Sequence, residues 1–285
     1  MSIIRMTILS LLAAMTAVHA QSSLLDLVDE GPATPTLVSA SFKTTRIINL
    51  HSIEQVGAGT WDLKIGHRFG FLSGGIYELF GLDQASIRIG MDYGVTDRFM
   101  IGAGRSSFEK TYDGFAKYSL LRQSSGRGGM PISLAYLGTA AVETLRSTSG
   151  EISGSSRWHY THQLLLGRKF SELFTLQLSP GVVHRNQVNT SDEANDVWNI
   201  PIGGRIRLNR RITLNAEYVI LLNDPLDEQF TPSLSLGFDI ETGGHVFQLH
   251  FSNSTSMIEK GFITETVGRW GDGDIHFGFN VSRVF

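Results

Sequence analysis

The sequence contains no cysteine among its 285 residues. Disulfide bonds, thiolate metal sites, a cysteine nucleophile, covalently attached c-type haem and a lipoprotein anchor are therefore excluded together. Proline is scarce, with 7 residues, whereas glycine is frequent, with 31. With a mean hydropathy near zero, this composition is typical neither of a disordered chain nor of a helical membrane protein.

Long apolar runs and positive charge are also missing. No internal run reaches the about 18 apolar residues that a transmembrane helix needs. The formal net charge is −3, which excludes a broadly basic nucleic-acid-binding protein.

The first residues follow the order of an export signal. Arg5 precedes the apolar stretch Met6–Ala17, and Val18-His19-Ala20 supplies small residues for cleavage. We predict a signal peptide over residues 1–20 and export of the chain, with a buried N-terminal helix as the weaker alternative.

The last stretch, Asp274–Phe285, alternates strictly. One parity is apolar and the other polar: Ile275, Phe277, Phe279, Val281 and Phe285 against His276, Gly278, Asn280 and Ser282. Successive strand side chains point to opposite faces, so this is a strand with one apolar face. Its aromatic end resembles the closing strand of bacterial outer-membrane β-barrels, which the barrel-assembly machinery reads. Arg283 lies on the apolar parity, where a long arginine can snorkel to the interface.

The same alternation recurs from Thr60 onward, in runs long enough to span a bilayer. A spanning strand takes roughly 9–11 residues, whereas the strands of a soluble β-sandwich average about 5–6. Aromatic residues gather near the strand ends, where membrane barrels carry their girdles: Trp61, Phe69, Phe99, Trp158, Phe170, Phe174 and Trp198.

Short and long connections alternate along the chain, as expected for an up-and-down barrel with short inner turns and long outer loops. We therefore predict an all-β, transmembrane antiparallel β-barrel of 12 strands over residues 60–285. Residues 21–59, including the strand-like Phe42–Leu50, become a periplasmic or lumen-associated segment, because such barrels close with even strand numbers. A barrel of 14 strands, recruiting Phe42–Leu50 and Gly261–Val267, is the alternative.

Two stretches, Gly81–Gly94 and Gly104–Tyr118, resemble an uncharacterised β-barrel family of Bacteroidota-type bacteria. Thr45-Arg46-Ile47-Ile48-Asn49 and His67-Arg68-Phe69-Gly70 fit the same family. The resemblance covers most of the mature chain. It implies a barrel in the bacterial outer membrane and supplies no reaction and no catalytic residue.

The inward parity is rich in charge, and basic groups outnumber acids. The charged residues and histidines on this parity are Asp62, Lys64, Arg68, Arg88, Asp92, Lys117, Lys169, Arg185, Arg205, Arg207, Glu217, Asp239, His250 and His276. Basic linings favour anions, so we predict a narrow channel or uptake protein for a small anionic solute. The alternative is that these charges pair with one another and simply fill the lumen.

Two loops carry further candidates. Arg105, Glu109, Lys110, Tyr112 and Asp113 could bind a partner or constrict the lumen, or form a salt-bridged surface hairpin. The longest loop, Ser254–Gly273, contains Met257, Ile258, Phe262, Ile263 and Trp270. Its apolar groups predict that it packs, as a lid on the barrel or against a partner.

No arrangement of residues predicts an enzyme, a metal or a cofactor. His159 and His162 fall on opposite strand faces, and His250 with His276 would make only a two-ligand site. No spacing singles out a serine triad. We expect membrane lipid and the assembly machinery as partners, and keep two further functions open: a non-conducting barrel that scaffolds an envelope complex, and a membrane-embedded hydrolase or acyltransferase.

Overall fold

The computed structural model describes residues 34–146, 154–188, 193–223 and 229–285. Leu37–Ser124 and Met130–Phe285 form one compact unit, and the other described residues belong to a second. The predicted signal peptide and residues 21–33 lie outside the described residues. Among the described helices, none has the length and apolar character needed to cross a bilayer.

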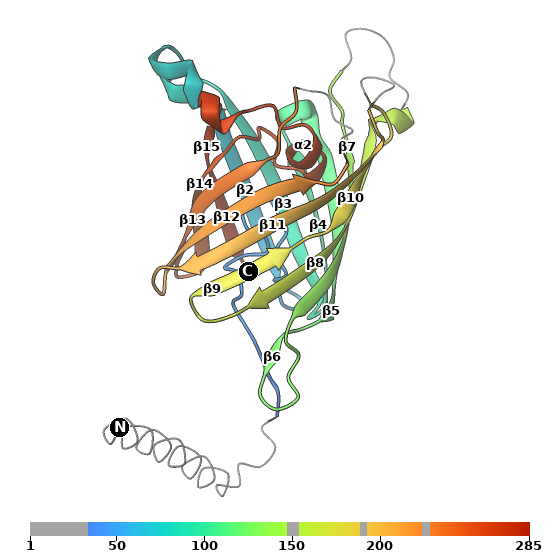
Figure 1. The fold of residues 1–285 in the computed structure, drawn as a ribbon, viewed down its shortest axis with the longest axis vertical. Helices are drawn as coiled ribbons and strands as arrows, with labels where there is room; N and C mark the ends of the chain where they lie inside the picture. The colour runs from blue at the N-terminus through green and yellow to red at the C-terminus, as the bar shows by residue number, and fades with distance from the viewer. Residues whose placement is uncertain (1–33, 147–153, 189–192, 224–228) are drawn as a thin grey trace, which may run out of the picture. The chain divides into compact units, whose positions relative to one another are not determined.

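The larger unit is a barrel of antiparallel strands (Figure 1). Its segments are β2 (Trp61–Phe71), β3 (Ala85–Thr96), β4 (Phe99–Ser106), β5 (Tyr112–Leu121), β7 (Ser133–Val142), β8 (Trp158–Lys169), β9 (Phe174–Leu178), β10 (Gly181–Arg185), β11 (Asp196–Arg207), β12 (Ile212–Leu221), β13 (Leu234–Thr242), β14 (His245–Ser252) and β15 (His276–Val284). Both β9 and β10 pair with β8 and β11. They are halves of one wall strand, interrupted at Pro180, which has no N–H to donate. The 13 segments thus make 12 wall strands. The two-residue strands β1 (Thr36–Leu37) and β6 (Ser124–Ser125) form a small sheet of their own.

The barrel closes where the last strand meets the first. β15 pairs with β2, and the N–H of Phe285 donates to the carbonyl oxygen of Trp61 at 2.8 Å. The predicted 12-strand barrel is therefore confirmed, and the 14-strand alternative is wrong. Gly261–Val267 overlaps the short helix α2 (Glu259–Thr264) instead of forming a strand, and Phe42–Leu50 contributes only to the isolated bridge Arg46–His51.

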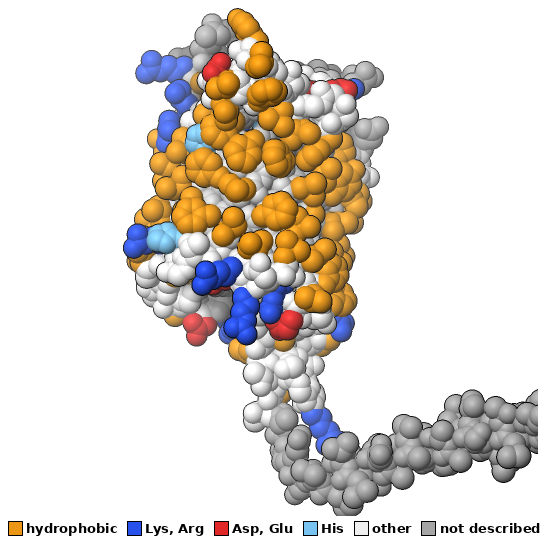
Figure 2. Space-filling view, turned by 90° about the vertical axis from the view of Figure 1, so that its left-hand side faces the viewer, with side chains coloured by type: hydrophobic (Ala, Val, Ile, Leu, Met, Phe, Trp, Pro, Cys, Tyr) orange, Lys and Arg blue, Asp and Glu red, His pale blue; other side chains and the backbone are white. Residues whose placement is uncertain are grey.

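The two faces of the wall differ as the alternation predicts. On β3, Ile89 is 51% exposed on the outside, whereas Arg88 and Asp92 are 7% and 2% exposed on the inside. Figure 2 shows a broad belt of apolar side chains over the wall. An apolar outer belt with a polar interior is the pattern of a barrel surrounded by lipid.

Connections at the two ends of the barrel differ in length. The end that holds Phe285, which we call the turn end, carries tight turns such as Asp97–Arg98 and Gly243–Gly244. The other end, the loop end, carries the short helices η1 (Leu72–Gly81), η2 (Phe108–Lys110), η3 (Gly154–Arg157), α2 and η4 (Trp270–Asp272). The structure thus has the sidedness that the sequence predicts.

The bore is filled by the chain that precedes the first wall strand. Ser41–Val56, which we call the plug, is a hairpin in which the N–H of Ser52 donates to Thr45 at 2.9 Å and that of Ile47 to Leu50 at 2.8 Å. Ile47 and Leu50 are each only 1% exposed. The segment left out of the predicted wall therefore lies inside the barrel.

A second inner segment, Asn253–Gly268, covers the plug from the loop end, and we call it the lid. It contains α2, which lies within the barrel outline in Figure 1, and Phe262 and Ile263 on it are 1% and 0% exposed. Together with the plug, these residues join one apolar core with inward wall side chains: Met100, Phe115, Ala135, Leu137, Leu165, Val183, Val197 and Val219. The inward face is apolar at these positions, because they face the plug and lid instead of water.

Inward glycines give the plug its space. A Cβ added to Gly94 would lie 2.7 Å from the carbonyl oxygen of Val56, and one added to Gly203 would lie 2.3 Å from Cδ1 of Ile47. Such approaches are possible only where the wall carries no side chain. The wall is therefore shaped to receive this segment.

Candidate functional site

The predicted lumen residues all lie on the inward face of the wall. Those that are buried are Lys64, Arg68, Arg88, Asp92, Lys117, Arg185, Arg205, Glu217, Asp239, His250 and His276. Lys169 and Arg207 lie at the turn end, where both pair with Glu172 at 2.7 Å. The structure separates this set into groups that hold the inner segments and groups that pair within the wall.

Arg68, on β2, holds both inner segments at once. Its guanidinium donates to the carbonyl oxygens of Ser254 at 2.5 Å and Ser256 at 2.9 Å in the lid. It also donates to Oδ1 of Asn49 at the tip of the plug, at 2.7 Å. Arg68 therefore ties plug and lid to the same point of the wall.

Two further cations hold plug carbonyl oxygens. The ammonium of Lys117 donates to Ser52 at 2.8 Å and to Glu54 at 2.5 Å. Arg205 donates to the carbonyl oxygen of Ser41 at 2.6 Å. Because carbonyl oxygens carry partial negative charge, they occupy the positions that an anion would take at these cations.

One wall carboxylate holds the turn of the plug. Glu217, on β12, accepts the N–H groups of Ile48 at 2.6 Å, Asn49 at 3.0 Å and Leu50 at 2.8 Å. Successive backbone N–H groups that converge in this way form an anion-binding nest. The contact fixes the deepest part of the plug to the wall.

Other inward charges are satisfied within the wall or its loops. Arg88 donates to Asp113 at 2.9 Å, Lys64 to Asp62 at 2.7 Å, and Arg185 to Glu193 at 3.1 Å. None of these pairs needs the plug for its neutralisation. The predicted pairing of lumen charges thus holds for this group, while Arg68, Lys117, Arg205 and Glu217 depend on the inner segments.

The middle of the bore is closed to solvent. Lys117 and Met100 are 0% exposed and Leu50 is 1% exposed. A cavity of about 390 Å³ opens near the turn end, lined among others by Lys43, Gln55 and Glu241. The described bore is therefore accessible near one mouth and sealed at its centre.

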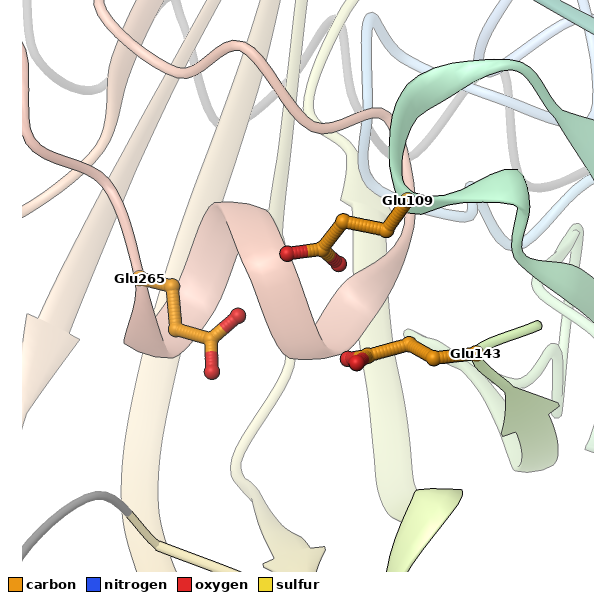
Figure 3. Close-up of side chains that lie close together, drawn as sticks. All are labelled: Glu109, Glu143 and Glu265. Carbon is orange, nitrogen blue, oxygen red and sulfur yellow. The ribbon is translucent and has the colours of Figure 1, made fainter. Parts of the chain in front are cut away.

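A cluster of three carboxylates lies at the loop end. Glu109 of η2, Glu143 after β7 and Glu265 after α2 point toward a common space beside the helix (Figure 3), with oxygens within 4.8 Å of one another. The ammonium of Lys260 contacts Glu143 and lies 2.7 Å from Glu265 and 4.0 Å from Glu109. Lys260 already supplies the cation that the carboxylates need, so we read the cluster as a salt-bridge hub that ties α2 to two outer loops and assign no metal to it.

The carboxylates of this hub differ in acidity. Burial, together with the neighbouring Glu143 and Glu265, raises the pKa of Glu109 to about 7 despite the attraction of Lys260. Burial alone would also raise the pKa of Glu143, but its hydrogen bonds with His159 and Lys260 lower that pKa to about 2. Glu109 is therefore the member that changes charge near neutral pH.

The docking of η2 on α2 should weaken as pH rises. In a released loop Glu109 loses its proton near its ordinary pKa of 4.5, whereas in the docked loop it keeps the proton to about 7, so docking loses free energy across that window. We expect amide hydrogen exchange of residues 107–111, corrected for intrinsic rates, to be several-fold faster at pH 8 than at pH 5. Glu109→Gln should remove this difference, and an unchanged pH dependence in that variant would contradict the assignment.

The predicted loop-binding residues are split among three places. Arg105 and Tyr112 lie on the outer face, with the guanidinium 5.5 Å from the ring centroid. Lys110 is exposed and Glu109 joins the hub. Asp113 is not a loop residue: it lies on β5, points inward and pairs with Arg88, because β5 begins at Tyr112 and alternation then turns its second residue into the bore.

Each of the four histidines considered from the sequence has its own partner among the described residues. His159 points inward beside Glu143, at 3.0 Å, whereas His162 points outward and contacts the hydroxyl of Tyr136 at 2.6 Å. His250 contacts Arg68 at 3.2 Å, and His276 contacts Oγ1 of Thr255 at 2.9 Å. The pairings that the structure describes are thus local.

Sequence reasoning missed the contacts that close the bore. Four of these contacts are made by backbone carbonyl oxygens, those of Ser254 and Ser256 to Arg68 and those of Ser52 and Glu54 to Lys117. The ion pair of Lys260 with Glu265 depends on how the loop folds. Backbone acceptors leave no mark on a sequence. The sequence signal was the apolar character of the Ser254–Gly273 loop, which predicted packing either as a lid on the barrel or against a partner.

The closed wall, the apolar belt and the polar interior together define an up-and-down membrane β-barrel. The chain belongs to a family described as a membrane bound beta barrel domain (DUF5777), which matches residues 42–285. The predicted resemblance to an uncharacterised barrel family is thereby confirmed, and the match says nothing about the bacterial group. The matched residues include the plug as well as the wall.

No curated protein matches the chain. Two solved structures to which the chain is similar are the NanC porin and the KdgM porin, each 8% identical with a TM-score of 0.48. Each alignment covers 79% of this chain, and 98% and 99% of the respective porin. At this level of similarity, neither structure carries information on the function of this chain.

Proposed function

We propose that this protein is a plugged channel of the bacterial outer membrane, closed at rest by residues 41–56 and selective for anions when the plug leaves. The observation that carries the proposal is the burial of a hairpin inside a 12-strand barrel. The hairpin is held by hydrogen bonds, ion pairs and apolar packing, and its described residues form no strand pairs with the wall. Because none of these contacts is covalent, the hairpin can leave without opening the sheet.

The balance of freed charges sets the predicted selectivity. Withdrawal of the plug takes carbonyl oxygens away from Lys117 and Arg205 and the Asn49 side chain away from Arg68, while Glu217 loses its three N–H donors. Three cations and one carboxylate of the buried wall interior are thus left without these partners, while Glu241 at the turn end and Glu259 of the lid also lose the plug cations Lys43 and Arg46. Pairs within the wall such as Arg88–Asp113 remain intact. Basic groups that line a pore favour anions.

The location and partners follow from the same proposal. We infer export through residues 1–20, insertion among outer-membrane lipids, and recognition of the closing strand and Phe285 by the barrel-assembly machinery. In support, Phe285 is 60% exposed on the outer surface next to Arg283, where a docking factor can reach it.

A non-conducting barrel that scaffolds an envelope complex is the second candidate. The continuous apolar core among plug, lid and wall favours it, because opening would expose these side chains to water. A catalytic role gains no such support: the histidine partners described above are Glu143, Tyr136, Arg68 and Thr255. We keep the proposal that the protein is not an enzyme.

A disulfide lock tests whether the plug gates conduction. An ideal Cβ on Gly167 lies 2.9 and 3.1 Å from the γ carbons of Ile53, so the two Cβ atoms lie near the short end of the about 3.5–4.5 Å that a disulfide spans. The natural chain has no cysteine, so Ile53→Cys with Gly167→Cys forms a unique pair. In planar bilayers we expect anion-selective openings from the reduced protein and none after oxidation.

The comparison is internal, because one preparation is measured before and after oxidation and again after reduction. The single variant Ile53→Cys serves as control and should conduct equally with and without oxidant. A folded, reduced double variant that never conducts, or that conducts equally when locked, would favour the scaffold over the channel.

A further inference from the structure

One plug contact has the form of a bound ligand. The carbonyl oxygens of Ser52 and Glu54 converge on the ammonium of Lys117 at 2.8 and 2.5 Å. Between them Ile53, 9% exposed, extends its side chain into the space in front of Gly167, where a Cβ would lie 2.5 Å from its Cδ1. Two oxygens on a cation, followed by an aliphatic group in an apolar slot, are the features of a carboxylate with a hydrocarbon tail.

The wall around Lys117 combines a buried cation with apolar side chains beside it. Lys117 pairs in register with Met100 on one side and with Leu137 on the other. Both are 0% exposed, and they belong to the same apolar core as Leu165, Val183 and Val197. The buried cation therefore lies in a short apolar strip formed by Met100, Leu137 and Leu165, which borders the polar inward side chain of Gln163 on β8.

This strip is unusual for the lumen of a membrane barrel, which is normally polar. Two and three strands away from β5, β3 and β2 present Lys64, Arg68, Arg88 and Asp92 to the interior. The bore thus has an apolar strip around the one cation Lys117 and, beside it, a charged group on β2 and β3. A small hydrophilic anion needs no such division, whereas a solute with a charged head and a hydrocarbon tail can use both.

We propose that the plug segment Ser52-Ile53-Glu54 is an internal mimic of the solute, and that the site at Lys117 binds an amphiphilic anion with a carboxylate head and an aliphatic tail. The inference rests on the proposed channel function and adds the class of solute. The carboxylate takes the place of the two carbonyl oxygens, and the tail lies along Met100, Leu137 and Leu165. Such a solute competes with the plug, so its arrival favours release of the plug.

Competition can be measured on the full-length protein without any conductance. Leu50→Cys places the only thiol of the chain at the tip of the plug, where the natural residue is 1% exposed. A water-soluble maleimide then labels this thiol only when the plug leaves its seat. The protein is held in lipid nanodiscs, and decanoate is the probe.

We expect decanoate to accelerate labelling by about tenfold at about ten times its dissociation constant. Propionate, decanol and decyltrimethylammonium supply the head alone, the tail alone and the opposite charge, and should each have little effect. Lys117→Met, which keeps the length and apolar body of the side chain, should abolish the decanoate effect. Arg88→Met, which removes a buried cation paired with Asp113 outside the site, should retain it.

Equal acceleration by decanoate, decanol and decyltrimethylammonium would show a general membrane effect and overturn the inference, as would no acceleration by decanoate. Should Leu50→Cys not fold, the rate of disulfide formation in Ile53→Cys with Gly167→Cys gives the second readout, and decanoate should slow it. Either failure leaves the disulfide-lock conductance result untouched. Conversely, absence of conductance would end the channel proposal without changing the labelling rates.

Discussion

Glu217→Gln is expected to turn a barrel that is mostly closed into one that conducts. The carboxylate accepts three N–H groups of the plug turn, from Ile48, Asn49 and Leu50. A hydrogen bond to a charged group contributes about 1.5–3 kcal/mol, and one between neutral groups about 0.5–1.5 kcal/mol. Loss of the charge therefore weakens the seat by about 3 kcal/mol, which is on the order of a hundredfold in the ratio of closed to open states.

Single-channel recording in planar bilayers gives the open fraction directly. Glu172→Gln is the matched control, because Glu172 pairs with Lys169 and Arg207 at the turn end and has no described contact with the plug. Its open fraction should equal that of the natural protein. An open fraction unchanged in Glu217→Gln, with the barrel folded, would mean that the carboxylate does not hold the gate.

Ile89→Arg is expected to destabilise the barrel in lipid by about 2–4 kcal/mol, the cost of an arginine on the lipid face near the bilayer midplane. Ile89 lies near the middle of β3 and is 51% exposed on the outer face. Reversible urea unfolding from liposomes measures this difference. A loss of this size in the free energy of unfolding would show that the outer face at Ile89 contacts hydrocarbon.

Position along the strand provides the control. Val95, 41% exposed on the same face, lies one residue from the turn end of β3. Val95→Arg should cost only about 0–1 kcal/mol, since an arginine near the interface reaches water. Equal costs at the two positions would argue against a membrane whose centre lies at Ile89.

The wall could be predicted from the sequence because a spanning strand repeats a simple rule. Each lipid-facing position must be apolar, so the parity of segments such as Ile275–Phe285 fixes face and strand together. The even strand number then excluded Phe42–Leu50 from the wall before its place was known. The alternation also placed Lys117 and Glu217 on the inner face.

The filling of the bore could not be predicted in the same way. Met100 and Leu165 occupy inward positions, and their neighbours in the chain, which point outward, are also apolar. Where both faces of a strand are apolar, the sequence does not show which face points inward. Their partners, Phe42 and Phe262 among them, lie in segments without periodicity. The anchors of the plug are backbone carbonyl and N–H groups, whose positions depend on the fold of the hairpin.

The role of the inward charges changed for the same reason. From the sequence, Arg68, Lys117 and Arg205 are members of a basic lining. In the structure each is satisfied by an inner segment, so the lining is a set of plug anchors first, and becomes a lining for anions only after the plug leaves.

The most direct measurement of the central claim is the yield of the disulfide between residues 53 and 167 in isolated membranes. The claim predicts near-complete cross-linking of Ile53→Cys with Gly167→Cys under mild oxidation, and none when Ile53→Cys is paired with Gly90→Cys on β3, where an added Cβ would meet Arg88 and Ala103 instead of the plug. A folded, membrane-inserted double variant whose thiols at 53 and 167 stay unlinked would contradict a plug seated inside the barrel.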